Sequence, residues 1–395
     1  MDWRLQQARN GELTLLLNGV AIYSKYRPYE DAVRWVLNEF DEEATHYLIM
    51  GLGLGYHAQA LAELTTKPIY VYYFNQKELD IFQQNGSQLA LNIKLINSLE
   101  LVANTSNLQL MIPNVWIKAI GENNVLYNTL DTIKRNQVSY KKFAPLMHSN
   151  AEKNKESHEH KPYPMRSSNT ACLVSSGPSL NETIEWLVEA KNVDIYVVGS
   201  ALKLVLAKGI HPKAVIITDA QQNIVKQLEN TDYKGMLFYL LTANAEAVNL
   251  HQGEKYMLCQ QGYEAAEELA EKYSLPKVAT GGSVATTTFS LLELLGYQNI
   301  VLFGQDLGFS GERTHAEGST SGKVVINSLL QIQANDGSVI KTQPNLYVYL
   351  RWFNEHCPTA KANIYNTARQ GAKINGTKLI TKEHFLQFEA CDKQS

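Results

Sequence analysis

The stretch that decides the predicted fold covers residues 280–318 and reads TGGSVATTTFSLLELLGYQNIVLFGQDLGFSGERTHAEG. Ser283 is a good N-cap and Gly296 is placed to end a helix, so a helix is predicted over residues 284–295. The run IVLF at residues 300–303 is short and wholly apolar, as in a strand buried on both faces. A polar, glycine-rich loop follows this strand, and ligands bind at such strand ends in open parallel α/β sheets.

Length and composition limit the class of protein. The 395 residues predict two or three domains, and 45% hydrophobic against 19% charged residues excludes wholesale disorder. A net charge of −3 provides no basic field for nucleic acid. The four cysteines lie far apart without a CxxC pair, which favours neither a zinc site nor a disulfide framework and fits a reducing cytoplasm. No apolar leader or run of about 18 apolar residues occurs, so we expect a cytoplasmic protein without a membrane segment.

The N-terminal part is predicted to be a Rossmann-like domain with a leading hairpin. Asn18-Gly19 between two apolar runs is a strong hairpin signal. Residues 47–64 read as strand, glycine-rich turn and helix, with glycines at 51, 53 and 55. Such a turn either binds a nucleoside, as in methyltransferases, or packs a helix closely on a sheet. A nucleoside site needs an acid after the next strand, but Asn75 stands there and no acid follows until Glu78, so we favour the packing interpretation.

Domain boundaries are predicted from a change in composition. Residues 151–168 are polar almost throughout and carry two prolines, which indicates a linker. The chain is therefore divided into an N-terminal domain (1–150), a polar linker (151–168) and a second domain (169–395). His158 and His160 within the linker are interpreted as surface residues rather than metal ligands.

Beyond the linker, strands alternate with helices. Apolar runs at 171–174, 195–198, 214–217, 236–241, 256–259 and 300–303 are separated by helical patterns. This order predicts an α/β fold with two Rossmann-like domains, the second a doubly wound and mainly parallel sheet. Asn335-Asp336-Gly337 predicts a later hairpin, followed by a helix near 346–357 and a last strand near 363–365.

Small polar residues follow the predicted strands of the second domain and would meet at one edge of its sheet. They are Ser175, Ser176, Gly177, Pro178, Ser179, Gly199, Ser200, Thr218, Asp219, Gln305 and Asp306. Hydroxyls, backbone amides and helix N-termini suit a phosphate and a ribose. Neither a GxxxxGK[ST] loop nor a GxSxG elbow occurs. Ser179 and Asp219 can equally be helix caps, and His315 is either a surface histidine or a general base.

An ordered set of short motifs resembles the motility accessory factor family of flagellin glycosyltransferases, whose central domain is similar to 6-hydroxymethylpterin diphosphokinase. The motifs cover nearly the whole chain: SKYRP at 24–28, GLGLGY at 51–56, SGPSL at 176–180, TD at 218–219, GGSVA at 281–285, GQDL at 304–307, THA at 314–316, NT at 366–367 and GAKI at 371–374. That central domain also resembles bacterial sialyltransferases, which bind a CMP-sugar and use a histidine as base.

The resemblance implies a reaction and a site. The implied donor is CMP-activated pseudaminate or legionaminate, and the implied acceptor is Ser or Thr of flagellin. The implied catalytic residues are His315 as base, with Asp219 and Asp306. The implied nucleotide-binding residues are Ser175, Ser176, Gly177, Pro178, Ser179, Gly199, Ser200, Thr218, Gly281, Gly282, Ser283 and Gln305. No cofactor is expected to be required, although Mg²⁺ remains possible.

Three alternatives stay open at this point. A pterin pyrophosphokinase would need ATP and a magnesium site at Asp219 and Asp306. A non-enzymatic assembly factor would bind flagellin without using His315. A methyltransferase built on the glycines at 51–55 is the weakest of the three, because Asn75 occupies the position of the expected acid.

Overall fold

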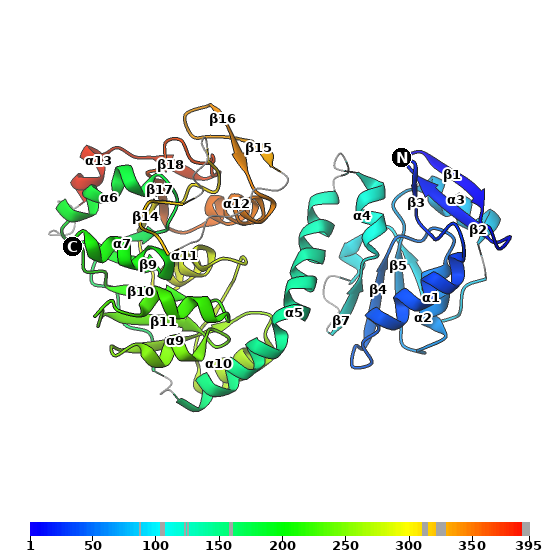
Figure 1. Cartoon of the computed structure of the whole chain (residues 1–395), viewed down its shortest axis with the longest axis horizontal. Helices are drawn as coiled ribbons and strands as arrows, with labels where there is room; N and C mark the ends of the chain where they lie inside the picture. Colours follow the sequence, from blue (N-terminus) through cyan, green and yellow to red (C-terminus); the bar gives the residue numbers. More distant parts are fainter. Residues whose placement is uncertain are drawn as a thin grey trace. The chain divides into compact units, whose positions relative to one another are not determined.

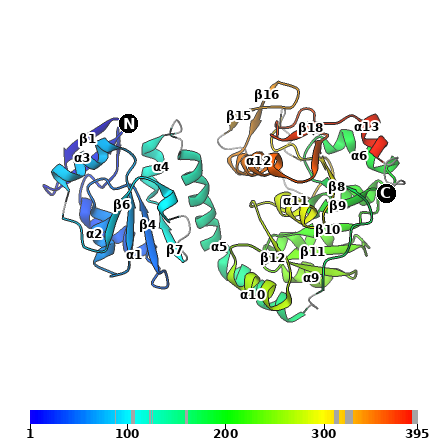
Figure 2. The same cartoon turned by 180° about the vertical axis from the view of Figure 1, so that it is seen from behind.

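The structure is a computed structural model that describes residues 1–86, 88–102, 107–121, 124, 126–157, 161–309, 315–320 and 329–388. The chain forms two compact units, Met1–Lys141 and Lys142–Ser395 (Figures 1 and 2). No described helix combines the length and the apolar content that crossing a membrane requires.

The first unit contains a small antiparallel sheet and a Rossmann-like parallel sheet. Its elements are β1 (Trp3–Gln7), β2 (Leu13–Leu17), β3 (Val20–Ala21), α1 (Pro28–Glu39), β4 (His46–Met50), α2 (Tyr56–Ala62), β5 (Ile69–Tyr72), α3 (Gln76–Asn85), β6 (Ile93–Ile96), a 3₁₀ turn (Leu99–Val102), β7 (Leu108–Met111), α4 (Asn114–Ile120) and the start of α5 (Tyr127–Ser157). Asn18 and Gly19 adopt positive φ angles of 52° and 80° between β2 and β3, which confirms the predicted hairpin. The parallel sheet has the strand order β6-β5-β4-β7.

The second unit is built on a nine-stranded sheet of order β13-β12-β11-β10-β9-β8-β14-β17-β18, in which every neighbouring pair is parallel. Its strands are β8 (Thr170–Val174), β9 (Asp194–Val198), β10 (Ala214–Ile217), β11 (Met236–Leu240), β12 (Lys255–Gln260), β13 (Lys277–Val278), β14 (Asn299–Phe303), β17 (Asn363–Asn366) and β18 (Thr377–Leu379). The hairpin of β15 (Leu330–Gln333) and β16 (Val339–Thr342) turns at Asn335-Asp336-Gly337, as predicted.

Helices connect these strands on both faces of the sheet. They are α6 (Leu180–Glu189), α7 (Leu202–Ala207), α8 (Val225–Leu228), α9 (Ala245–Leu250), α10 (Glu264–Tyr273), α11 (Val284–Leu294), α12 (Pro344–His356) and α13 (Lys382–Gln387), with 3₁₀ turns at Gly199–Ala201, Gln222–Ile224 and Cys357–Thr359. Since parallel crossovers are right-handed, α6 to α10 cover one face while α11 and α12 cover the other. Contacts of α11 with β8, β9, β10 and α12 agree with this arrangement, and Figure 1 shows α12 beside α11 and α13 beside α6.

The central strands are buried because their side chains are covered on both faces. All five residues of β8 are buried, as are the last four of β14, which the wholly apolar run at 300–303 predicted. These results confirm the predicted α/β class with a doubly wound, parallel second sheet.

One predicted boundary differs from the structure. Residues 151–157 were expected to start a linker, but they form the last turns of α5. Asn150 Nδ2 donates to the carbonyl of Ala220 (3.0 Å), and Asn154 Nδ2 donates to those of Leu241 and Ala243 (2.8 Å each). The linker prediction is therefore wrong over residues 151–157, since their polar side chains bind backbone groups of the second unit. His158 and His160 lie outside the described residues.

Candidate functional site

The larger sheet has a topological switch point between β8 and β14. From β8 the chain continues toward β9, and from β14 it continues in the opposite direction toward β17. In open α/β sheets, ligands bind at the carboxyl edge beside such a point. The predicted loops at residues 175–179 and 304–306 follow the two strands of this switch point.

Backbone hydrogen bonds tie these two loops together. Ser175 N–H donates to the Phe303 carbonyl and Gly177 N–H donates to the Gly304 carbonyl, both at 2.8 Å. The Ser175 hydroxyl donates to Gln305 Oε1 at 2.6 Å. We expected backbone amides of these loops to bind a phosphate. The N–H groups of Ser175 and Gly177 already have acceptors within the protein, so they do not do so.

Asp306 fixes the start of α6. Its carboxylate accepts hydrogen bonds from Ser179 N–H (3.2 Å) and from the Ser179 hydroxyl (2.8 Å). Burial raises the pKa of Asp306 to about 6, although the Ser179 donors favour the charged form. A Cβ added at Gly177 would lie 2.2 Å from Asp306 Oδ2, so only glycine fits between the two loops. These contacts support a positioning role for the Asp306 carboxylate.

His315 lies beside the loop that follows β8. The next residue, Ala316, donates its N–H to the Ser176 carbonyl at 2.8 Å, and Thr320 N–H donates to the Ser200 carbonyl at 3.1 Å. The Ser176 and Ser200 hydroxyls are hydrogen-bonded to each other at 2.9 Å. The structure thus brings His315, Ser176 and Ser200 to one edge, as predicted from strand ends. Thr314 of the same motif lies outside the described residues.

The protonation state of His315 suits a base. Its side chain is half-buried, and burial lowers its pKa below the ordinary value of 6.5. The imidazole is therefore neutral at pH 7 and able to accept a proton.

Asp219 lies at the end of β10, two strands from β8. Its side chain is half-buried and its Oδ1 accepts from Gln221 N–H at 3.0 Å, so it shapes the turn and does not cap a helix. Thr218 before it is also half-buried, whereas Gly199 is buried and Pro178 is half-buried at the start of α6. Every one of these residues follows a strand of the same edge.

The Gly281-Gly282-Ser283 turn reaches this edge through α11. Ser283 caps α11 by the predicted geometry, in a capping box with Thr286. Thr286 Oγ1 accepts hydrogen bonds from Gly281 N–H (3.1 Å) and Ser283 N–H (3.2 Å). These two amides are therefore occupied within the turn.

Aromatic rings of α12 explain the glycines of this turn. A Cβ added at Gly281 would lie 2.5 Å from Trp352 Cγ, and one at Gly282 would lie 3.3 Å from Tyr349 Cε1. Burial and the negative charge of Asp219 raise the pKa of Tyr349, which keeps its hydroxyl protonated. Tyr349 thus packs on the α11 N-terminus and is close enough to Asp219 to be affected by its charge. The sequence predicted the helix but not which of its side chains meets the site, because that depends on the packing of α12 on α11.

The described residues contain no group of three or more His, Cys, Asp or Glu side chains that could hold a metal ion. Asp219 and Asp306, which the pyrophosphokinase alternative would use for Mg²⁺, are hydrogen-bonded to Gln221 and Ser179 respectively. Each carboxylate therefore accepts hydrogen bonds within its own part of the edge.

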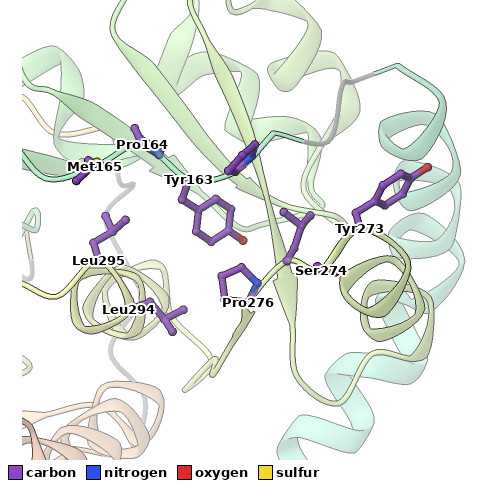
Figure 3. Close-up of a pocket in the computed structure, with 10 residues that line it drawn as sticks. Tyr163, Pro164, Met165, Tyr273, Ser274, Pro276, Leu294 and Leu295 are labelled. Carbon is purple, nitrogen blue, oxygen red and sulfur yellow. The ribbon is translucent and has the colours of Figure 1, made fainter.

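A different pocket, of about 390 Å³, lies at the opposite edge of this sheet (Figure 3). Its walls come from residues 162–165, 273–276 and 294–295, which precede β8, β13 and β14. The Tyr163 hydroxyl donates to the Met257 carbonyl at 3.1 Å. Because this pocket is at the amino ends of the strands, it is separate from the predicted site.

The switch point of the first unit, between β4 and β7, is filled by the protein itself. Glu78 is completely buried, and its carboxylate accepts from the N–H groups of Leu52 and Gly53 (2.8 Å each) and of Phe74 (2.6 Å). A Cβ added at Gly51 would lie 2.2 Å from the ring of Trp116. The glycine-rich turn therefore packs against the unit's own side chains, which supports the packing interpretation and disfavours a methyltransferase.

The buried Glu78 carboxylate predicts that the free energy of unfolding depends on pH. Burial raises the pKa of Glu78 to about 7, against the hydrogen bonds that favour its charged form. Because the folded-state pKa exceeds the unfolded value, this group's contribution is greatest below about pH 4.5 and falls as pH rises to 7, by about 3 kcal/mol. We expect the difference in unfolding free energy between wild type and Glu78→Gln, measured in urea, to change by that amount. The exposed change Glu43→Gln is the control, and parallel curves for all three proteins would contradict the assignment.

Comparisons with known proteins agree with this architecture. Residues 143–312 match a family model described as 6-hydroxymethylpterin diphosphokinase MptE-like. The structure of MAf glycosyltransferase from Magnetospirillum magneticum AMB-1 is similar with a TM-score of 0.50 and 16% identity, over 99% of this chain and 73% of that one. A 65-residue stretch is 38% identical to an uncharacterised protein of Treponema pallidum (strain Nichols), covering 16% of this chain and 22% of that relative. The predicted resemblance is confirmed for the MptE-like domain and for the fold.

Proposed function

We propose that this chain, which carries an MptE-like domain within the fold of a motility accessory factor glycosyltransferase, is itself a glycosyltransferase. Its donor is a CMP-activated nonulosonic acid of the pseudaminic or legionaminic type, and its acceptor is a Ser or Thr hydroxyl of flagellin. We further propose that it works in the cytoplasm, with residues 169–395 as the catalytic domain.

The observation that supports this proposal is that the backbone around His315 contacts the loop that carries paired serine hydroxyls at the switch point of the larger sheet. The N–H of Ala316 donates to the Ser176 carbonyl, and the Ser176 and Ser200 hydroxyls are hydrogen-bonded to each other. The phosphate of the nucleotide would be held by these hydroxyls and by Thr218 and Ser283 at the same edge.

The chemistry needs only these groups. The bond between the anomeric carbon and the phosphate oxygen breaks, and CMP leaves with the electron pair. The acceptor oxygen forms the new bond to that carbon while its proton passes to His315. Since CMP is already a good leaving group, the protein has to stabilise the phosphate charge and accept one proton. Asp306 acts indirectly, by holding Ser179 and the loop after β8, and Asp219 lies at the same edge, where its charge raises the pKa of Tyr349.

Pterin pyrophosphoryl transfer is the second candidate, since the matching family model bears the name of that enzyme. It requires ATP and Mg²⁺, whereas Asp219 and Asp306 each accept hydrogen bonds within the protein. The occupied carboxylates therefore favour the transferase.

Nucleotide binding and product mass test the proposal. We expect CMP to raise the melting temperature of the purified chain, because a ligand that binds only the folded state stabilises it, whereas ATP with Mg²⁺ has no effect. Intact-mass measurement of flagellin from hosts with and without the gene should differ by multiples of a nonulosonate residue. Protection by ATP with Mg²⁺ alone would favour the kinase, and unchanged flagellin mass would exclude the proposed acceptor.

A further inference from the structure

The helix α12 starts at the same edge as the proposed site. Thr342, two residues before the helix, donates its hydroxyl to the Leu307 carbonyl at 2.6 Å, and Leu307 directly follows Asp306. Further along the helix, Tyr349 packs on Gly282 at the N-terminus of α11. The first half of α12 therefore extends from the loop after β14 to the start of α11.

The first turn of α12 lacks a side-chain cap. Gln343 is the N-cap residue with φ −92° and ψ 155°, but its side chain accepts no hydrogen bond from the helix, and the turn contains no acidic residue. Most N-caps use an oxygen to satisfy the first amides, which otherwise carry the positive end of the helix dipole. This 13-residue helix therefore begins without a side-chain cap and without an acidic residue of its own in the first turn.

The Gln343 side chain provides a second, independent sign of a missing acceptor. The residue is only 6% exposed, and its Nε2 has no hydrogen-bond partner in the described part of the chain. A buried amide donor without an acceptor costs about 1–3 kcal/mol. Gln343 is the N-cap residue, so this donor belongs to the residue that precedes the first amides of α12.

We propose that the N-terminus of α12 and Gln343 Nε2 bind the carboxylate of the donor sugar, and so select an acidic sugar over a neutral one. The inference rests on the proposed function, because a nonulosonate carries a carboxylate on its anomeric carbon, next to the phosphate. N–H donors at a helix N-terminus suit such a group without a lysine or arginine.

Calorimetric titration of three probes tests this inference: CMP, CMP-N-acetylneuraminate and free N-acetylneuraminate. We expect wild type to bind CMP-N-acetylneuraminate about 10–100-fold more tightly than CMP, the range for hydrogen bonds to a charged group. Gln343→Glu should abolish that difference by repelling the carboxylate, while CMP affinity stays within twofold. Because Gln343 is buried, the melting temperature of the variant is compared with that of wild type to check that it is folded. Gln331→Glu, on the exposed face of β15, is the matched control.

The three probes separate the failure of this inference from the failure of the proposed function. If CMP binds but Gln343→Glu leaves the affinity for CMP-N-acetylneuraminate unchanged, the carboxylate subsite is excluded and the CMP donor stands. If CMP does not bind but free N-acetylneuraminate binds to wild type and not to Gln343→Glu, the carboxylate subsite is supported and the CMP-activated donor is excluded. Binding of none of the probes overturns both.

Discussion

Replacing His315 with asparagine should lower kcat of sugar transfer by about 10²–10⁴-fold, the usual contribution of a positioned general base. Asparagine is of similar size and polarity but cannot take up the acceptor's proton. Affinity for CMP should stay within twofold, because the nucleotide is held by the hydroxyls of the neighbouring loops. The measurement is transfer from a CMP-nonulosonate to purified flagellin under single-turnover conditions, which report the chemical step rather than product release.

The pH profile of the wild type should carry the signature of the same group. Since burial lowers the pKa of His315 below 6.5, kcat should be level at neutral pH and fall only in the acid range. The matched control is His211→Asn, an exposed histidine that comes before β10 and so lies at the other edge of the sheet. Equal activity of His315→Asn and wild type would remove His315 from the reaction and favour the flagellin-binding factor, which does not need a base.

Replacing Asp194 at the amino edge of the same sheet should strongly lower the stability of the fold. Asp194 at the start of β9 is 5% exposed, and its Oδ2 accepts from Lys213 Nζ (2.8 Å), Ser167 N–H (2.8 Å) and the Tyr297 hydroxyl (2.5 Å). Asp194→Ala leaves the Lys213 charge and the Tyr297 hydroxyl without their acceptor. We expect the free energy of unfolding to fall by about 3–5 kcal/mol in urea titrations.

The pH dependence of this loss identifies its cause. Burial alone would raise the pKa of Asp194, but its donors, Lys213 foremost, outweigh burial and lower it. A lowered folded-state pKa means that the carboxylate stabilises the fold above about pH 4 and loses this effect as pH falls through the folded value. The difference in unfolding free energy between wild type and Asp194→Ala should therefore become smaller at acid pH. Glu185→Ala, which removes an exposed ion pair with Lys208, should cost less than about 1 kcal/mol, and an equal cost for both would refute the buried network.

The sequence predicted the elements whose signals are local. Apolar runs gave the buried strands, Asn18-Gly19 and Asn335-Asp336-Gly337 gave the hairpins, and Ser283 gave the start of α11. The strand ends likewise predicted which residues share an edge, since parallel strands must place them together.

The features that the sequence missed depend on contacts between distant residues. Asn154 lies in the polar stretch that was interpreted as a linker. In the structure it belongs to α5 and binds the carbonyls of Leu241 and Ala243, which are distant in the sequence. Glu78 was passed over because it comes after the position where a ribose-binding acid is expected, yet it reaches back to the glycine-rich turn. β18 is three residues long, too short for a periodic pattern, and both it and α13 were missed.

The proposed site and the buried Asp194 network occupy opposite ends of the same strands. The strands β8 and β9 are five residues long, so about 17 Å of rigid backbone separates the buried Asp194 network from the loops that carry Ser176 and Ser200. Residues this far apart without shared partners contribute additively. Saturation libraries at Ser200, Thr218 and Gln343 can therefore explore new sugar donors while the fold keeps its full tolerance to mutation.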